Sequence, residues 1–199
     1  MIPAHQQAAI KEASELINTR TIACLRSVLA QEEDVKTEDG HVADLTMFQE
    51  KEDDMIRSHN FGNLAASVVL TFETTFEDLD QVTPSRRMEM FTKRAGLLVN
   101  MLVADACAAA TGRPTITPFP GLRYRIGYRI GAALLHASGR TTFTENVCAL
   151  ADAVEKRMHR ECDSELARIL APILDEIPDH SSDPLNDEDA RGIPYATYF

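Results

Sequence analysis

The sequence predicts an all-α fold, a single-domain helical bundle of about six helices with a long C-terminal helix and an irregular acidic tail. Apolar residues recur with the helical period along nearly the whole chain. Only one short stretch shows the alternation typical of a strand. A chain of 199 residues with 44% hydrophobic residues can bury one core without disulfides. We expect a helical domain over residues 1–177 and an acidic tail with an aromatic terminus over residues 178–199.

The first half of the chain predicts three helices, over about residues 4–31, 42–57 and 61–79. The second is highly charged, and its apolar anchors are Leu45, Phe48 and Met55. The third is the clearest amphipathic segment, since its apolar residues fall at the i, i+3, i+4, i+7 spacing of one buried stripe.

A fourth helix is expected from Thr83 to about Thr111. Thr83 suits an N-cap and Pro84 the first helical position, and Gly112 ends the helix. Because residues 97–110 are apolar nearly all round, we expect this helix to be the central one. Asp105 lies within that stretch, so we expect a buried carboxylate, as the partner of an arginine or, alternatively, as a catalytic acid.

The second half of the chain predicts two more helices. One should cover about residues 122–138. The other starts at a capping-box candidate formed by Thr142 and Glu145, and its apolar positions run on as one long rod to about residue 173. Pro172 should kink or shorten the last turns, because proline removes an amide donor and clashes with the preceding turn.

The four cysteines lie far apart, and each sits among apolar residues at helical spacing. We interpret Cys24, Cys107, Cys148 and Cys162 as reduced core thiols rather than metal ligands, and we predict no metal site and no cofactor. The first residues lack the basic and apolar regions of a secretory signal, and no stretch is apolar enough to span a membrane. A cytoplasmic location is therefore expected.

Charge is unevenly distributed along the chain. The net charge is −11, which argues against non-specific nucleic-acid binding. Residues 106–144, however, contain five arginines and no Asp or Glu, whereas the segments before and after are acidic. Arginine presents a planar, always ionised fork suited to carboxylate or phosphate. A local contact with phosphate or RNA therefore stays open.

A tandem tetrapeptide, Tyr-Arg-Ile-Gly twice over, occupies residues 124–131. On a helix, Arg125, Arg129, His136 and Arg140 would form one basic stripe. The glycines Gly127 and Gly131 would form a small face for close packing against another helix. The same residues also alternate as a strand would, and we favour the helix because the following residues continue naturally as one.

The basic stripe has two interpretations. It can bind an anion or an acidic partner, with the neighbouring tyrosines available for stacking. Alternatively, its arginines pair with the chain's own acidic residues, Asp105 included, because structural ion-pair networks often imitate sites.

Arg129 and His136 are separated by six residues, which resembles the Arg-x(4–6)-His pair of HEPN-type ribonucleases. That resemblance implies an all-α domain that acts as a dimer and cleaves RNA by metal-independent acid–base chemistry across the dimer interface. The two residues would form the catalytic pair.

Two carboxylate pairs, Glu50 with Asp53 and Glu77 with Asp80, resemble the E-x-x-E and E-x-x-D motifs of all-α NTP pyrophosphohydrolases. Carboxylates at i, i+3 share a helix face, and two such pairs on adjacent helices can hold Mg²⁺ over a triphosphate. A solvated acidic face is the alternative interpretation, and the one we favour.

The leading hypothesis from the sequence is a non-enzymatic helical binding or assembly protein. It would act through protein–protein contacts, with a partner or with itself as a homo-oligomer. The features that suggest it are the glycine face, the segregated charge and the acidic tail with its aromatic terminus.

Overall fold

The computed structural model describes residues 3–30, 34–69, 79, 82–113 and 141–177, and this part of the chain is all-α, as the sequence predicted. It contains six helices, namely α1 (Ala4–Leu29), α2 (Thr46–Gln49), α3 (Glu52–Ile56), α4 (His59–Gly62), α6 (Pro84–Ala110) and α8 (Thr141–Leu174). Within the same residues the only β-structure is an isolated antiparallel bridge between Lys36 and Val42.

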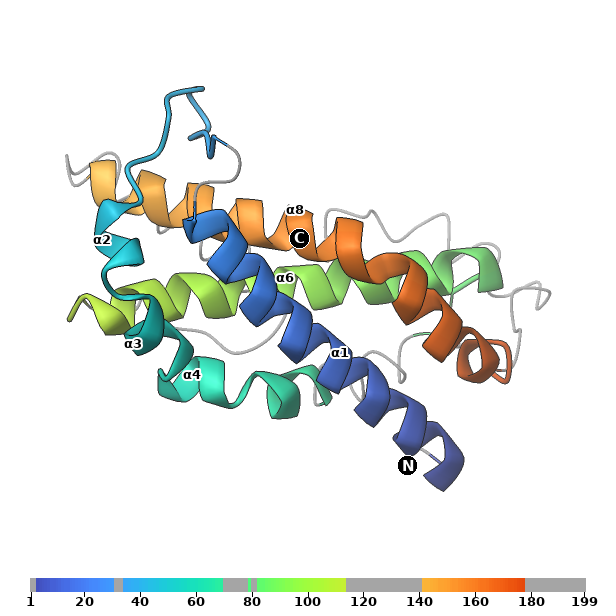
Figure 1. The fold of residues 1–199 in the computed structure, drawn as a ribbon. Helices are drawn as coiled ribbons and strands as arrows, with labels where there is room; N and C mark the ends of the chain where they lie inside the picture. The colour runs from blue at the N-terminus through green and yellow to red at the C-terminus, as the bar shows by residue number, and fades with distance from the viewer. Residues whose placement is uncertain (1–2, 31–33, 70–78, 80–81, 114–140, 178–199) are drawn as a thin grey trace.

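The three long helices form the bundle, and α8 packs against both α1 and α6 (Figure 1). Both neighbours run antiparallel to it. The start of α1 meets the end of α8 through His5 and Glu176, and the start of α6 meets it through Arg87 and Leu174. Residues 97–110 were expected to belong to the central helix, and α6 packs against α8 as well as against α3 and α4. Residues 102–108 of α6 are buried without interruption.

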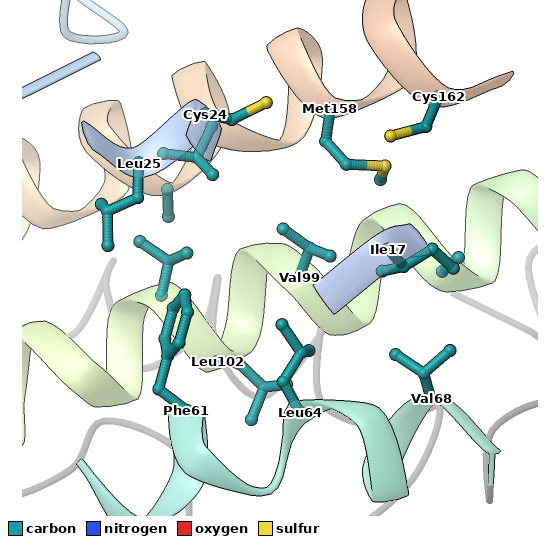
Figure 2. Packing of buried hydrophobic residues seen from close by; sticks show 14 of the residues in the cluster. Ile17, Cys24, Leu25, Phe61, Leu64, Val68, Val99, Leu102, Met158 and Cys162 are labelled. Carbon is teal, nitrogen blue, oxygen red and sulfur yellow. The ribbon is translucent and has the colours of Figure 1, made fainter. Parts of the chain in front are cut away.

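The core lies where the long helices meet and continues under the short ones (Figure 2). α3 and α4 pack against α6, and α8 lies along another side of α6. The labelled side chains come from all these layers and are at most 6% exposed: Ile17, Cys24, Leu25, Phe61, Leu64, Val68, Val99, Leu102, Met158 and Cys162. Apolar burial of this kind is the main stabilising contribution to a bundle.

The ends of α6 follow local signals in the sequence. Pro84 occupies the first turn as predicted, but Thr83 makes no capping bond and its hydroxyl lies 3.4 Å from the Ser85 hydroxyl instead. At the other end Gly112 has a φ of 66°, and the Arg113 amide donates to the Ala108 carbonyl at 2.9 Å. Glycine reverses the chain there because it adopts positive φ without a steric cost.

The segment before α6 differs from the prediction. Instead of one helix over residues 42–57, the chain forms α2 and α3, separated by a break at Glu50 and Lys51. The expected helix from Phe61 is also interrupted, by a turn at Asn63, and helical structure resumes over residues 64–69. The apolar anchors Leu45, Phe48 and Met55 are all buried, so the apolar spacing was read correctly but does not require a continuous helix.

Helix α8 is the long C-terminal helix that the sequence predicted. Its 34 residues span about 50 Å at the α-helical rise. It begins at Thr141, so Thr142 lies inside the first turn and is not the N-cap. The helix continues through Pro172 and ends two residues later, at Leu174, so the expected shortening is not seen. The predicted helix over residues 122–138 and the acidic tail lie outside the described residues.

Candidate functional site

The predicted basic stripe and glycine face lie outside the described residues. This applies to Arg125, Gly127, Arg129, Gly131, His136 and Arg140, and also to the carboxylates Glu77 and Asp80. The residues that flank this segment are described: the Arg113 guanidinium stacks 3.7 Å from the centroid of the Phe143 ring. The C-terminal end of α6 and the N-terminal end of α8, which flank the predicted basic stripe in the sequence, therefore lie next to each other.

Asp105 is buried, as predicted, with 8% of its surface exposed in the most enclosed part of α6. Asp105 takes part in a hydrogen bond or an electrostatic interaction. The expected arginine partners Arg125 and Arg129 lie outside the described residues, so their pairing with Asp105 stays a prediction.

The remaining predicted carboxylate pair does not have the expected geometry. Glu50 follows α2, and Asp53 lies in α3, so the two do not share the face of one helix. Both are exposed. The i, i+3 argument for a metal-binding face at these two residues therefore does not apply.

A row of polar side chains lies between α6 and α8, and the sequence did not predict it. We call it the polar seam, and it consists of Asn100, Asp152, Glu155, His159 and Asp163. The side-chain amide of Asn100 donates to Asp152 Oδ1 at 2.6 Å and to Glu155 Oε2 at 2.8 Å. One amide thus bridges two carboxylates on successive turns of α8. A bond of this kind to an ionised acceptor is stronger than one between neutral groups.

The seam continues to a histidine held between carboxylates. Nδ1 of His159 lies 3.0 Å from Asp163 Oδ1, and Nε2 lies 3.9 Å from Glu155 Oε1. The imidazole fits against α6 because residue 96 is glycine: a Cβ there would lie 2.1 Å from His159 Nε2. Nε2 therefore faces the backbone of α6.

This polar seam is suited to fixing the register of α6 against α8. The Asn100 bonds cross the helix interface, and His159, paired with carboxylates of its own helix, fits against Gly96 of α6. The described residues contain no cluster of His, Cys, Asp or Glu that could hold a metal ion. The sequence carries a signal, because Glu155, His159 and Asp163 recur every four residues and so share one helix face. The partner Asn100 lies on another helix and carries no such signal.

Arg87 forms a second feature that the sequence did not reveal. Its side chain is only 2% exposed. One terminal nitrogen donates to the carbonyls of Leu174 at 2.9 Å and of Ile177 at 2.7 Å, and Nε donates to the Val82 carbonyl at 3.2 Å. The last carbonyls of a helix have no partner within it, so Arg87 caps α8 from the first turn of α6.

A hairpin between α1 and α2 projects from the helices of the described chain (Figure 1). The Thr37 amide donates to the His41 carbonyl and the Ala43 amide to the Val35 carbonyl, each at 2.8 Å, and Gly40 turns with a φ of 81°. In this pattern Lys36 and Val42 form a pair without mutual hydrogen bonds, so their amides and carbonyls point outward.

The hairpin is anchored to the rest of the protein at its second strand. The Asp44 amide donates to the Asn146 side chain of α8 at 3.2 Å. Asp44 in turn accepts a bond from the Thr46 amide at the start of α2, and hydrogen bonds from the Thr46 side chain and amide lower the pKa of Asp44. Phe48 of α2 packs on Phe143, with ring centroids 5.8 Å apart.

Two large apolar side chains are exposed on this part of the molecule, and the described residues contain no others of this kind. Val42 on the hairpin is 64% exposed and Met47 on α2 is 40% exposed. We call the hairpin together with α2 and α3 (residues 34–56) the hairpin surface. It carries eight carboxylates and two lysines between residues 34 and 54. It is thus an acidic surface with two apolar side chains on it.

Three of the four cysteines are core thiols, as predicted. All four are free, and Cys24, Cys107 and Cys162 are buried, whereas Cys148 is partly exposed. Burial raises the pKa of Cys24 to about 11 and that of Cys162 to about 12, and it raises the pKa of Cys107 further. Because the thiolate is the reactive form, these three thiols are poor nucleophiles.

Comparisons of the chain with family models, with curated proteins and with solved structures find no match. None of the helices in the described ranges combines the length and apolar character needed to cross a membrane.

Proposed function

We propose that this chain is a non-enzymatic helical binding or assembly protein that acts through protein–protein contacts. The hairpin surface is the observation that supports the proposal. Single exposed apolar side chains are common on proteins. Here Val42 and Met47 lie on adjacent elements and are accompanied by exposed polar side chains, a pattern typical of an interface with an apolar centre and a polar rim.

The way in which the hairpin is held supports the same proposal. The base of the hairpin is fixed to α8 by the hydrogen bond from Asp44 to Asn146, and α2 is fixed to α8 by the contact of Phe48 with Phe143. The exposed part of the hairpin is therefore held in place by the helices. A prearranged surface loses less conformational entropy on binding than a loose loop does. We also propose that the protein acts in the cytoplasm, since its four free thiols suit a reducing compartment.

Lysine-directed cross-linking in intact cells, read by mass spectrometry, tests this function. Lys36 and Lys51 lie on the hairpin surface, whereas Lys11 and Lys156 are exposed elsewhere and serve as controls. We expect intermolecular cross-links, to another protein or to a second copy, to concentrate at Lys36 and Lys51. We also expect them to disappear in the double variant Val42→Ser, Met47→Ser. Cross-links spread evenly over the four lysines, or their absence, would refute the proposal.

A further inference from the structure

We propose that the hairpin surface binds a cationic peptide segment of a partner protein, one that presents arginine or lysine together with apolar side chains. This inference rests on the proposed function and names the chemistry of the partner. It starts from charge: the surface has four times as many carboxylates as lysines. Asp34, Glu38, Asp39, Glu50 and Asp53 are exposed, and no cation among the described residues forms an ion pair with them.

The tip of the hairpin shows why a cation fits. Glu38 and Asp39 follow one another at the turn, next to Gly40, and both are exposed. Val42 is three residues beyond Asp39, and its carbonyl points away from the hairpin ladder. An arginine can pair with these carboxylates and donate to that carbonyl, while a neighbouring apolar side chain covers Val42.

The same charge pattern decides against a second hairpin as the occupant. Two copies meeting at this surface would bring two strongly acidic surfaces together, and like charges in such a position are repulsive. The backbone groups of Lys36 and Val42 would otherwise permit pairing between copies. The acidic surface thus disfavours its own copy and favours a basic segment.

Fluorescence anisotropy with a labelled cationic peptide tests the inference. A suitable probe has the sequence of residues 122–131, which contains three arginines and no acidic residue. A peptide with those arginines replaced by glutamate is the control. Titrated with the full chain, the arginine peptide should bind, the glutamate peptide should not, and binding should weaken at least about fivefold between 50 and 300 mM salt.

Two charge-reversal variants locate the binding. Glu38→Lys with Asp39→Lys should weaken binding about tenfold, because both attractive carboxylates become repulsive. The matched control, Glu12→Lys with Glu15→Lys, makes the same change in net charge on α1, where both side chains are well exposed, and should stay within about twofold of the unmodified chain.

Equal weakening by the two variants would show non-specific attraction and overturn the inference, and so would an absence of binding. Self-association that depends on Val42 would overturn it too, since the occupant would then be a second copy. These failures are distinguishable from failure of the proposed function. Cross-links concentrated at Lys36 and Lys51 without peptide binding would leave that function standing and refute only the cationic partner.

Discussion

The two ends of the bundle each hold an arginine at the junction of α6 and α8, and the two arginines are used in opposite ways. Arg87 is buried at the end of α8, and its guanidinium donates hydrogen bonds to three backbone carbonyls. Arg113 is exposed at the start of α8 and lies on the face of Phe143. Arg87 caps the C-terminal end of α8. Arg113 stacks on Phe143, and the Phe143 ring also packs on Phe48 of the hairpin surface.

The two ends of the fold therefore depend on their arginines to different degrees. A buried guanidinium is held only where every donor finds an acceptor, so the Arg87 end tolerates little change. An exposed cation–π contact is worth much less. The Phe143 end can therefore vary in sequence at a lower cost in stability, which suits the binding surface that we propose there.

Replacing each arginine with methionine should show the difference between the two ends most clearly. Arg87→Met leaves three carbonyls without their donor and should lower the free energy of unfolding by about 3 kcal/mol or more. Arg113→Met should cost about 0.5–1 kcal/mol. Urea denaturation followed by circular dichroism measures both.

Arg86→Met, at the exposed neighbour of Arg87, is the control for the loss of one positive charge near the start of α6. It should change the free energy of unfolding by about 0.5 kcal/mol or less. A cost for Arg113→Met as large as that for Arg87→Met would contradict the division between the two ends.

Between the two ends, the polar seam should show an intermediate effect. In Gly96→Ala the new methyl group collides with His159, and the free energy of unfolding should fall by about 1–3 kcal/mol. Gly62→Ala is the matched control: it lies in α4 with nothing within 4 Å of the added Cβ, and it should be neutral or slightly stabilising.

A double-mutant cycle with His159→Ala identifies the cause of the Gly96 effect. With the imidazole removed, alanine at position 96 meets no clash, so its cost should largely vanish. If Gly96→Ala costs as much without His159 as with it, the seam does not fix the register of the two helices in the way described.

The smallest expected effect concerns pH at the Arg87 end. Hydrogen bonds from His5, and then from Gln6, lower the pKa of Glu176. A carboxyl whose pKa is lower in the folded state stabilises the fold above its unfolded pKa, and this contribution disappears as the pH falls through the folded value.

Glu176→Gln should therefore make the free energy of unfolding less sensitive to acid, as measured by urea denaturation between about pH 6 and pH 3. Asp44→Asn, at the opposite end of the bundle, should also make the free energy of unfolding less sensitive to acid, because the pKa of Asp44 is lowered as well. An unchanged acid profile in both variants would show that neither carboxylate contributes.

The sequence predicted best the parts of the fold that depend on local chemistry. The start of α6 at Pro84 and its end before Gly112 follow from the restricted φ of proline and the free φ of glycine. The burial of Asp105 follows from its apolar neighbours. The length of α8 follows from one sustained apolar period.

The misses depend on contacts between residues far apart in the sequence. Arg87 looks like an ordinary surface residue of an amphipathic helix until Leu174 and Ile177 are brought to it. The fit of His159 against Gly96 likewise requires the register of α6 on α8. The break at Glu50 and Lys51 was missed because the spacing of Leu45, Phe48 and Met55, three and then seven residues, is compatible both with one helix and with two short ones. The predicted basic stripe lies outside the described residues.

The packing of α1 against α8 has a consequence for the order in which the protein forms. The N-terminal helix α1 packs chiefly against α8, and the two are separated by more than a hundred residues of chain. During synthesis on the ribosome the apolar face of α1 emerges long before its main partner exists. The apolar side chains Ile10, Ile17 and Leu25 thus stay without their main partner until α8 leaves the exit tunnel. A nascent chain halted before Thr141 would expose this face and invite chaperones or aggregation.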